Sequence, residues 1–200
     1  SPDLVASLYR LGIGFGIAVV AGVGLGFVLA GSPRLNQAFG PVVEFARFLP
    51  PPVTAPIFII LWGIGDLAKI VFIVFGAIWP ILMNTVDGAR SVDDVKISTA
   101  RVYGITGWRR LVHLTLPASG PRIAVGIRNG LAAGLITMAV GEMIGSSDGV
   151  GYVMLRAQQE FATPEMWSGM IMLGLLGYAL NAILTIIEHR GLFGHLQRRT

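Results

Sequence analysis

Apolar segments long enough to cross a bilayer alternate with short polar stretches along this chain. A helix needs about 20 apolar residues to cross the hydrocarbon. Four segments of about this length occupy residues 8–30, 67–84, 123–144 and 166–187. A shorter apolar segment, residues 53–64, follows residues 42–49 and the triplet Pro50-Pro51-Pro52, which must break or kink any helix there. The pattern predicts an all-α polytopic membrane protein with about five spans.

Composition agrees with a chain built to face lipid. Hydrophobic residues make up 54% of the 200 residues and charged residues 13%, and the mean hydropathy is +0.71. Soluble domains carry about 25% charged residues. The chain has no cysteine, which excludes a disulfide framework and a thiolate metal site. His113, His189 and His195 lack metal-ligand spacing, so no metal site is expected.

Basic residues divide unequally between the two sides that five spans define. One side holds Arg34, Arg47, Arg90, Lys96, Arg101, Arg109, Arg110, Arg122, Arg190, Arg198 and Arg199. The other holds Arg10, Lys69 and Arg156. Because positive loops stay in the cytoplasm, segment 91–117 and the C-terminus are predicted to be cytoplasmic and segment 145–165 external. The net charge of +4 belongs to these loops and does not indicate nucleic-acid binding.

Segment 91–117 is polar yet patterned for helix. Ser91 with Asp94 three residues later is close to a capping box, and Asp93 and Asp94 suit the positive end of a helix dipole. Val95, Thr99, Val102 and Tyr103 recur at helical spacing and form one face. The pattern predicts a short helix on the cytoplasmic surface.

The same segment continues with a second predicted helix. Ala100 and Gly104 form a small-residue stripe, and Gly104 can end the first helix. Thr106 then starts a second short helix that Pro117 is expected to stop. Long ordered loops are usually functional, so the pair is expected to dock a soluble partner.

The spacing within this segment resembles the EAA loop of the permease subunits of ABC importers. That motif reads Glu-Ala-Ala, three residues, Gly, nine residues, Ile, one residue, Leu-Pro. Ala100, Gly104 and the final Leu116-Pro117 match it in place, and Leu114 replaces the Ile. Ser98 stands where the family has Glu, so Asp94 or Arg101 is expected to make the contact that the Glu normally makes.

Further motifs extend the resemblance over nearly the whole chain. They are Phe48-Leu49-Pro50, Ala55-Pro56, Leu61-Trp62-Gly63-Ile64-Gly65, Asn84-Thr85-Val86-Asp87-Gly88, Glu142-Met143-Ile144 and Gly149-Val150-Gly151. Together they are similar to the permeases of nitrate, bicarbonate, taurine and aliphatic sulfonate importers. Importers of riboflavin or pyrimidine precursors share much of the pattern. Family members have one more N-terminal span, which is expected to precede Ser1.

The resemblance implies a single type I importer transmembrane domain over residues 1–200, in a bacterial inner membrane. Two permease copies, most often identical, would work with two cytoplasmic ATPases and a periplasmic or lipid-anchored binding protein. ATP and Mg would bind the ATPases, because this chain carries no Walker A motif, no cofactor site and no catalytic residue. The expected ATPase-docking residues are Asp94, Ala100, Arg101, Tyr103, Gly104, Leu114 and Pro117.

Two charged residues interrupt the fourth span, where charge is costly and often functional. Arg128 either snorkels or forms an ion pair, or it attracts an anionic substrate. Glu142 either accepts hydrogen bonds from amides around Ser146 and Gly149, or it acts as a gate. Both are therefore candidate pathway or gate residues.

Several alternatives remain open at this stage. The glycine pairs Gly12–Gly16 and Gly22–Gly26 suit helix packing within one subunit or between two. Segment 145–165 either meets the binding protein or packs as a lid. A self-sufficient channel or secondary carrier would use the proline-broken span and Arg128, but it would have no need of segment 91–117.

Overall fold

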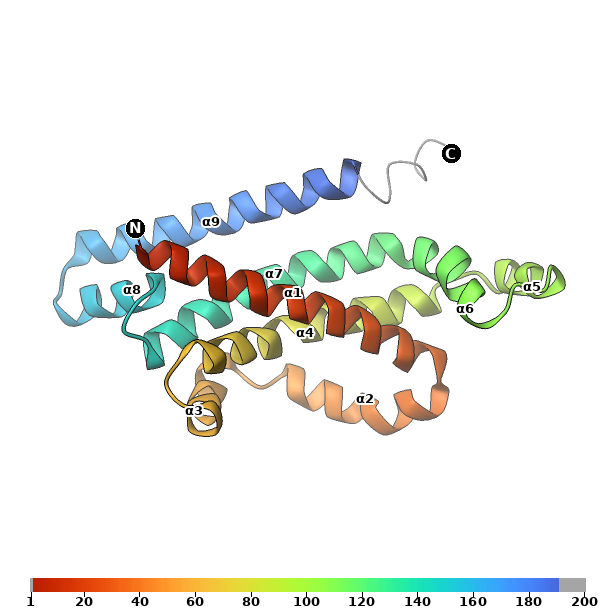
Figure 1. Cartoon of the computed structure of the whole chain (residues 1–200), viewed down its shortest axis with the longest axis horizontal. Helices are drawn as coiled ribbons and strands as arrows, with labels where there is room; N and C mark the ends of the chain where they lie inside the picture. The colour runs from red at the N-terminus through yellow and green to blue at the C-terminus, as the bar shows by residue number, and fades with distance from the viewer. Residues whose placement is uncertain (1, 191–200) are drawn as a thin grey trace.

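Long helices lying side by side make up most of the computed structural model, which describes residues 2–190. They are α1 (Pro2–Gly31), α4 (Asp66–Arg90), α7 (Leu116–Gly145) and α9 (Thr163–Arg190) (Figure 1). The shorter helices are α2 (Pro33–Arg47), α3 (Pro51–Trp62), α5 (Asp94–Val102), α6 (Gly107–Arg110) and α8 (Val150–Gln159), with a π-helical turn at Leu111–Thr115. Every regular element in the described part of the chain is helical, as predicted.

Four of the five predicted spans are present as long helices, and the fifth corresponds to a bent pair of helices. Four helices are long and apolar enough to cross a membrane, and α2 with α3, bent by 104°, meets the same criterion as a pair, either as one broken span or as a re-entrant loop. The bend has a chemical cause, because Pro50 is extended (φ −67°, ψ 133°) and Pro51 opens α3. α2 runs back from the end of α1 toward the middle of the molecule, where the break lies (Figure 1).

The first helix of segment 91–117 forms, but its predicted start is wrong. Ser91 ends α4, where its hydroxyl donates to the Gly88 carbonyl (2.9 Å). Asp93 is the N-cap of α5 and accepts a hydrogen bond from the Val95 amide (2.8 Å). The predicted end is confirmed, since Gly104 follows the C-cap of α5 with a φ of +71°, a conformation that suits glycine.

The predicted stop at Pro117 is wrong. The helix that begins at Gly107 continues through the π-helical turn and through Pro117 into α7, so that one span covers Gly107–Gly145. A proline removes one N–H donor from a helix. The π-helical turn immediately before Pro117 changes the hydrogen-bond register there, which lets the helix pass the proline without ending.

The core lies where α1, α4 and α7 pack against one another. Gly14, Gly22 and Gly26 of α1 meet α4 so closely that an added Cβ would lie 2.6–2.9 Å from Ile73, Ile81 or Thr85. For Gly22 and Gly26 the packing interpretation within one subunit is therefore confirmed. Gly12 and Gly16 lie on the open side of α1, where an added Cβ has no neighbour within 4 Å among the described residues. Packing within this subunit does not explain that second pair.

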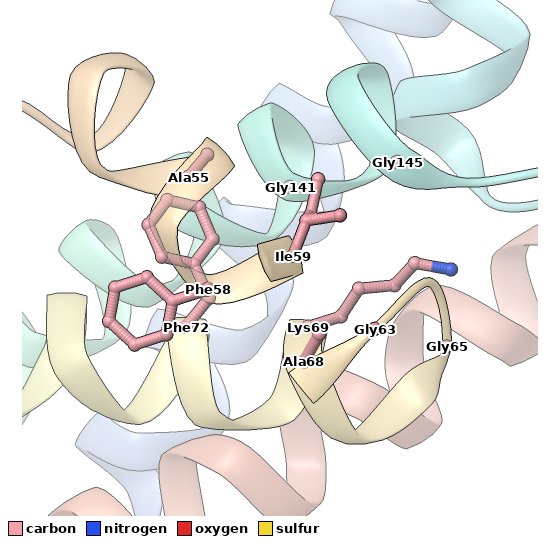
Figure 2. Close-up of a pocket in the computed structure, with 10 residues that line it drawn as sticks. All are labelled: Ala55, Phe58, Ile59, Gly63, Gly65, Ala68, Lys69, Phe72, Gly141 and Gly145. Atoms are coloured by element: carbon pink, nitrogen blue, oxygen red, sulfur yellow. The ribbon is translucent and has the colours of Figure 1, made fainter. Parts of the chain in front are cut away.

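The second half of the broken span is anchored to α4 and α7 by aromatic and small residues. Figure 2 shows Phe58 of α3 lying against Phe72 of α4, and their ring centroids are 5.1 Å apart. Ile59 approaches Gly145 of α7, where an added Cβ would lie 2.7 Å from the Ile59 Cδ1. This packing fixes α3 and with it the position of the break.

The two ends of the bundle differ in what they carry. We call them the α5 end, from which α5 extends, and the α8 end, where α8 and the N-terminus lie (Figure 1). Arg10 and Lys69 contact the α7–α8 loop at the α8 end, as the charge pattern predicts. Arg47, which the charge pattern counts with the loop arginines, ends α2 at the break and lies beside the middle of α4.

Candidate functional site

The predicted docking residues divide between a projecting helix and the start of α7. α5 extends beyond the ends of α4 and α7 (Figure 1). Val95, Val102 and Tyr103 are 69%, 86% and 78% exposed. Exposed apolar side chains gathered on a projecting helix are typical of an interaction surface.

The remaining docking candidates differ in how exposed their side chains are. Asp94, Arg101 and Gly104 are exposed on or beside α5, as is Ser98. Ala100 is only 8% exposed, which places its methyl group against this chain and not on the free face of α5. Leu114 and Pro117 are half-buried in the helix that leads into the fourth span.

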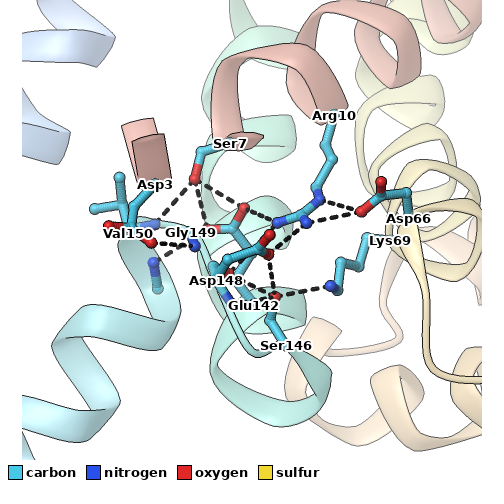
Figure 3. A network of polar contacts seen from close by, with 11 residues as sticks. Asp3, Ser7, Arg10, Asp66, Lys69, Glu142, Ser146, Asp148, Gly149 and Val150 are labelled. Atoms are coloured by element: carbon cyan, nitrogen blue, oxygen red, sulfur yellow. Dashed lines mark hydrogen bonds and ion pairs between the residues drawn. The ribbon is translucent and has the colours of Figure 1, made fainter. Parts of the chain in front are cut away.

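A buried polar network occupies the α8 end, and Arg10 is its centre (Figure 3). The Arg10 guanidinium donates to Asp66 at the start of α4 (2.7 Å), to Glu142 of α7 (3.0 Å) and to Asp148 (2.5 Å). Arg10 is 3% exposed and Glu142 is fully buried. A buried charge of either sign is tolerated only when it is paired and hydrogen-bonded, which this arrangement provides.

The same network caps the start of α8. Three successive backbone amides donate to side chains of other helices: Gly149 to Asp3 (3.1 Å), Val150 to Ser7 (3.0 Å) and Gly151 to Glu142 (3.1 Å). The first amides of a helix have no partner inside the helix, and carboxylates are favoured at that end. The N-terminus of α8 is therefore fastened to α1 and α7 by the side chains that satisfy it.

The glycines around α8 make this approach possible. Gly149 has a φ of +102°, and an added Cβ there would lie 2.4 Å from the Glu142 carboxyl carbon. At Gly151 an added Cβ would lie 2.3 Å from the Ala139 carbonyl oxygen. The Gly-Val-Gly sequence is thus required for contact between α8 and α7.

A second branch of the network runs through the α7–α8 loop. Lys69 donates to the Ser146 hydroxyl (2.7 Å), and that hydroxyl donates to the Asp148 carbonyl (2.5 Å). The hydrogen bond from Arg10 holds the pKa of the Asp148 carboxyl below its ordinary value. The network therefore joins α1, α4, α7 and α8 into one unit.

The network fastens four helices to one another. Among the described residues no group of histidine and acidic side chains could hold a metal ion. Sequence reasoning singled out Glu142 and missed Ser7, Arg10 and Asp66, whose partners are 56 to 138 positions away along the chain. The signal that could have found them is an arginine inside an apolar span, which requires a partner.

Arg128, the other charged residue of the fourth span, lies far from Glu142 along α7. It forms an ion pair with Glu188 of α9. Ion pairing was one of the two interpretations left open for Arg128. The structure does not bring the two candidate pathway residues together.

A cavity of about 650 Å³ lies beside the break between α2 and α3. Its walls come from the last residue of α2, the first residue of α3, the segment between them, the middle of α4 and α7. Arg47, Asn84, Asn129 and Thr137 supply polar side chains, and Phe75 and Trp79 supply aromatic walls. The volume falls within the range of about 300–1,000 Å³ that small-molecule sites occupy.

Comparison with known proteins identifies the family. The family model described as "Binding-protein-dependent transport system inner membrane component" matches residues 19–190. The chain is 30% identical to the aliphatic sulfonates transport permease protein of Bacillus subtilis (strain 168) and 29% identical to the taurine transport system permease of Escherichia coli (strain K12), in each case over 94% of this chain and 68% of the relative. It is 29% identical to a nitrate import permease of Leptolyngbya laminosa, over 94% of this chain and 67% of that protein.

A solved structure shows the same fold. The inward-facing MetNI methionine ABC transporter has a chain that superposes with a TM-score of 0.82 at 18% identity, covering 93% of both chains. The fold is therefore that of a type I ABC importer transmembrane domain, as the segment 91–117 resemblance implied. The chain belongs to the family of binding-protein-dependent transport system inner membrane components, the permease subunits of ABC importers.

Proposed function

We propose that this permease docks a cytoplasmic ATPase through α5 and imports a small oxyanion that an external binding protein delivers. Two copies of the chain would enclose the pathway, and two ATPase subunits would bind ATP and Mg. The chain itself would hydrolyse nothing. ATP-driven closure of the ATPases would move the docked helices and switch the spans between inward-open and outward-open states.

The observation that carries the proposal is the exposed apolar face of α5. Val95 and Val102, seven residues apart on one face of the helix, are both largely exposed. Ile97 and Ala100, on the other side, are at least half-buried against the chain. A helix that is held on one side and bare on the other suits a soluble partner that covers the bare side.

Charge supports a cytoplasmic position for this helix. The α5 end carries Arg34, Arg90, Lys96, Arg101, Arg109, Arg110 and Arg122 in or beside its loops and helix ends. The α8 end carries Arg10, Lys69 and Arg156. Positive loops stay in the cytoplasm, so the α8 end would face the binding protein.

The substrate class rests on the relatives and on the cavity. The three relatives named above are named for aliphatic sulfonates, taurine and nitrate. A sulfonate group and nitrate are both small, charge-delocalised oxyanions. The cavity beside the break offers a cation and no carboxylate among the described residues that line it, which suits an anion better than a neutral riboflavin-like molecule.

Single cysteines test the docking directly, because the chain has none of its own. Val102→Cys in the purified complex is expected to cross-link to the ATPase with a short bifunctional reagent, and Val153→Cys in α8 serves as the matched control. In sealed right-side-out vesicles an impermeant maleimide should label Val153→Cys and spare Val102→Cys. A chain that purifies without an ATPase, or the reverse labelling, would contradict the proposal and favour a self-sufficient carrier.

A further inference from the structure

We propose that Arg47 is the residue that binds the oxyanion inside the translocation cavity, and that the break between α2 and α3 exists to place it there. The inference rests on the proposed function, because it assigns the substrate contact within the same permease. It assigns to Arg47 the anion-attracting role that the sequence analysis left open for Arg128.

The position of Arg47 in the fold supports this assignment. Arg47 is the last residue of α2, and the extended Pro50 prevents the helix from continuing. The cavity wall on α4 runs from Phe75 to Asn84, which lie about 14 Å and about 27 Å along the helix from Asp66 at a rise of about 1.5 Å per residue. The cavity that Arg47 lines is therefore within the span and not at a loop.

The charge of the cavity wall also supports the assignment. Arg47 is the one charged side chain among the described residues that line this cavity. Arg10 and Arg128 each pair with carboxylates, whereas Arg47 forms no ion pair within the described part of the chain. The acidic residue one turn earlier, Glu44, lines a different cavity together with Arg90. Arg47 is exposed and lines this cavity, and arginines of membrane spans that face a cavity typically serve a function.

The geometry of the Arg47 N–H donors supports it as well. The Arg47 guanidinium lies over the Phe48 ring, with its Cζ 4.7 Å from the ring centroid. Stacking of this kind steadies the planar group and leaves its in-plane N–H donors available. A guanidinium fork matches two oxygens of a sulfonate or nitrate group with parallel charge-assisted hydrogen bonds.

A neutral donor in the same wall completes the match. Trp79 lines the cavity with its ring, while its indole Nε1–H is buried away from the cavity and has no acceptor among the described residues. Asn84 donates one amide N–H to the Pro80 carbonyl (2.8 Å), and its second amide N–H makes no other hydrogen bond among the described residues. The wall thus presents donors, and the group it fits carries acceptors and negative charge.

Anion quenching of tryptophan fluorescence tests this without any partner protein. Trp62, Trp108 and Trp167 are replaced by Phe, which leaves Trp79 as the reporter among the four tryptophans. At constant ionic strength, Arg47→Gln is expected to lower the iodide and nitrate quenching constants roughly threefold, because the cavity loses its counter-charge. Quenching by neutral acrylamide should stay unchanged, and Arg47→Lys should retain most of the anion effect. The matched control Arg128→Gln should leave all quenchers unaffected.

Transport by the complete complex gives the second readout. In proteoliposomes that contain the permease, its ATPase and its binding protein, Arg47→Gln should slow ATP-dependent uptake of taurine or methanesulfonate about tenfold through the loss of a charge-assisted bond. Unchanged anion quenching in Arg47→Gln, or uptake at the wild-type rate, would overturn the assignment of Arg47. If the wild-type complex imports no oxyanion although the quenching contrast is present, the proposed function fails while anion binding at Arg47 stands.

Discussion

The Arg10 guanidinium donates to the Glu142 carboxylate across 132 positions of sequence, with Nη1 and Oε1 3.0 Å apart and both side chains buried. This one contact joins the first span to the fourth. Glu142 also accepts from Ser7 and from the Gly151 amide, so the contact extends to α8. The α8 end of the permease is therefore held by buried polar bonds, in contrast to the apolar and glycine packing of α1 against α4.

Removing Arg10 should destabilise the protein more than removing any exposed arginine. Arg10→Met leaves Glu142 buried without its cation, and breaking a buried pair in this way costs about 3–5 kcal/mol. Thermal unfolding of the detergent-solubilised chain measures the loss. Arg156→Met, which removes an exposed pair with Glu160, is the control and should melt close to the wild type. Equal melting of the two variants would show that the network contributes nothing.

The glycine spacing of α1 gives a matched pair of variants. Gly22→Val places a side chain 2.9 Å from the Ile81 Cγ2 and should cost about 1–3 kcal/mol through overpacking. Gly24→Val, two residues on, points into open space and should be nearly neutral. Unfolding temperatures of the two variants measure the difference. A Gly24→Val variant that is the less stable of the two would refute the assignment of faces.

Charge on the bare face of α5 should weaken ATPase docking and so lower both transport and substrate-stimulated ATP hydrolysis. Val102→Glu adds a carboxylate to a surface that the proposal covers with the ATPase, so substrate-stimulated ATPase activity and uptake should fall together, about tenfold or more, since desolvating an unpaired charge costs several kcal/mol. Val102→Thr keeps the shape and should retain both activities. Normal stimulation by Val102→Glu would remove this face from the docking surface.

A charge at Ala100 is expected to destabilise the protein itself. Because Ala100 is buried against the chain, Ala100→Asp should lower thermal stability by burying a charge, in addition to any effect on docking. Ser98→Asp, at an exposed position of the same helix, is the control for the charge alone. Unfolding temperatures that are the same for both variants would show that Ala100 is not packed as described.

Asp148 should make the α8 end sensitive to acid. Its pKa is lowered in the folded protein by the hydrogen bond from Arg10, so its contribution to stability is complete above the unfolded value of about 3.9. That contribution is lost as the pH falls below this value and through the lower pKa of the folded state. Melting temperatures measured across this acidic range should fall more steeply for the wild type than for Asp148→Asn. Parallel curves would contradict the contact with Arg10.

Local patterns predicted much of this fold because membrane spans and helix breaks are local. Hydropathy found the spans, Pro50 located the break, and Gly104 located the end of α5. The predicted helix end at Pro117 was wrong, because a π-helical turn before the proline allows the helix to continue. No residue pattern predicted that turn.

The polar sites were harder to predict because they depend on contacts between distant segments. Glu142 was recognised as an intramembrane charge, but its partners Ser7 and Arg10 come from the other end of the sequence. Arg47 was counted with the loop arginines, since a charge count cannot tell that α2 folds back and brings its last residue beside the middle of α4, where it lines a cavity. Both cases concern where a charged side chain is placed in three dimensions.

The central claim is that this chain is a permease driven by an ATPase that docks on α5. Uptake of radiolabelled taurine or methanesulfonate into proteoliposomes, with each component omitted in turn, tests it most directly. The account predicts uptake only when the permease, the ATPase, the binding protein and ATP are all present, and its loss in Val102→Glu. Uptake by the permease alone, or uptake that Val102→Glu leaves intact, would contradict it.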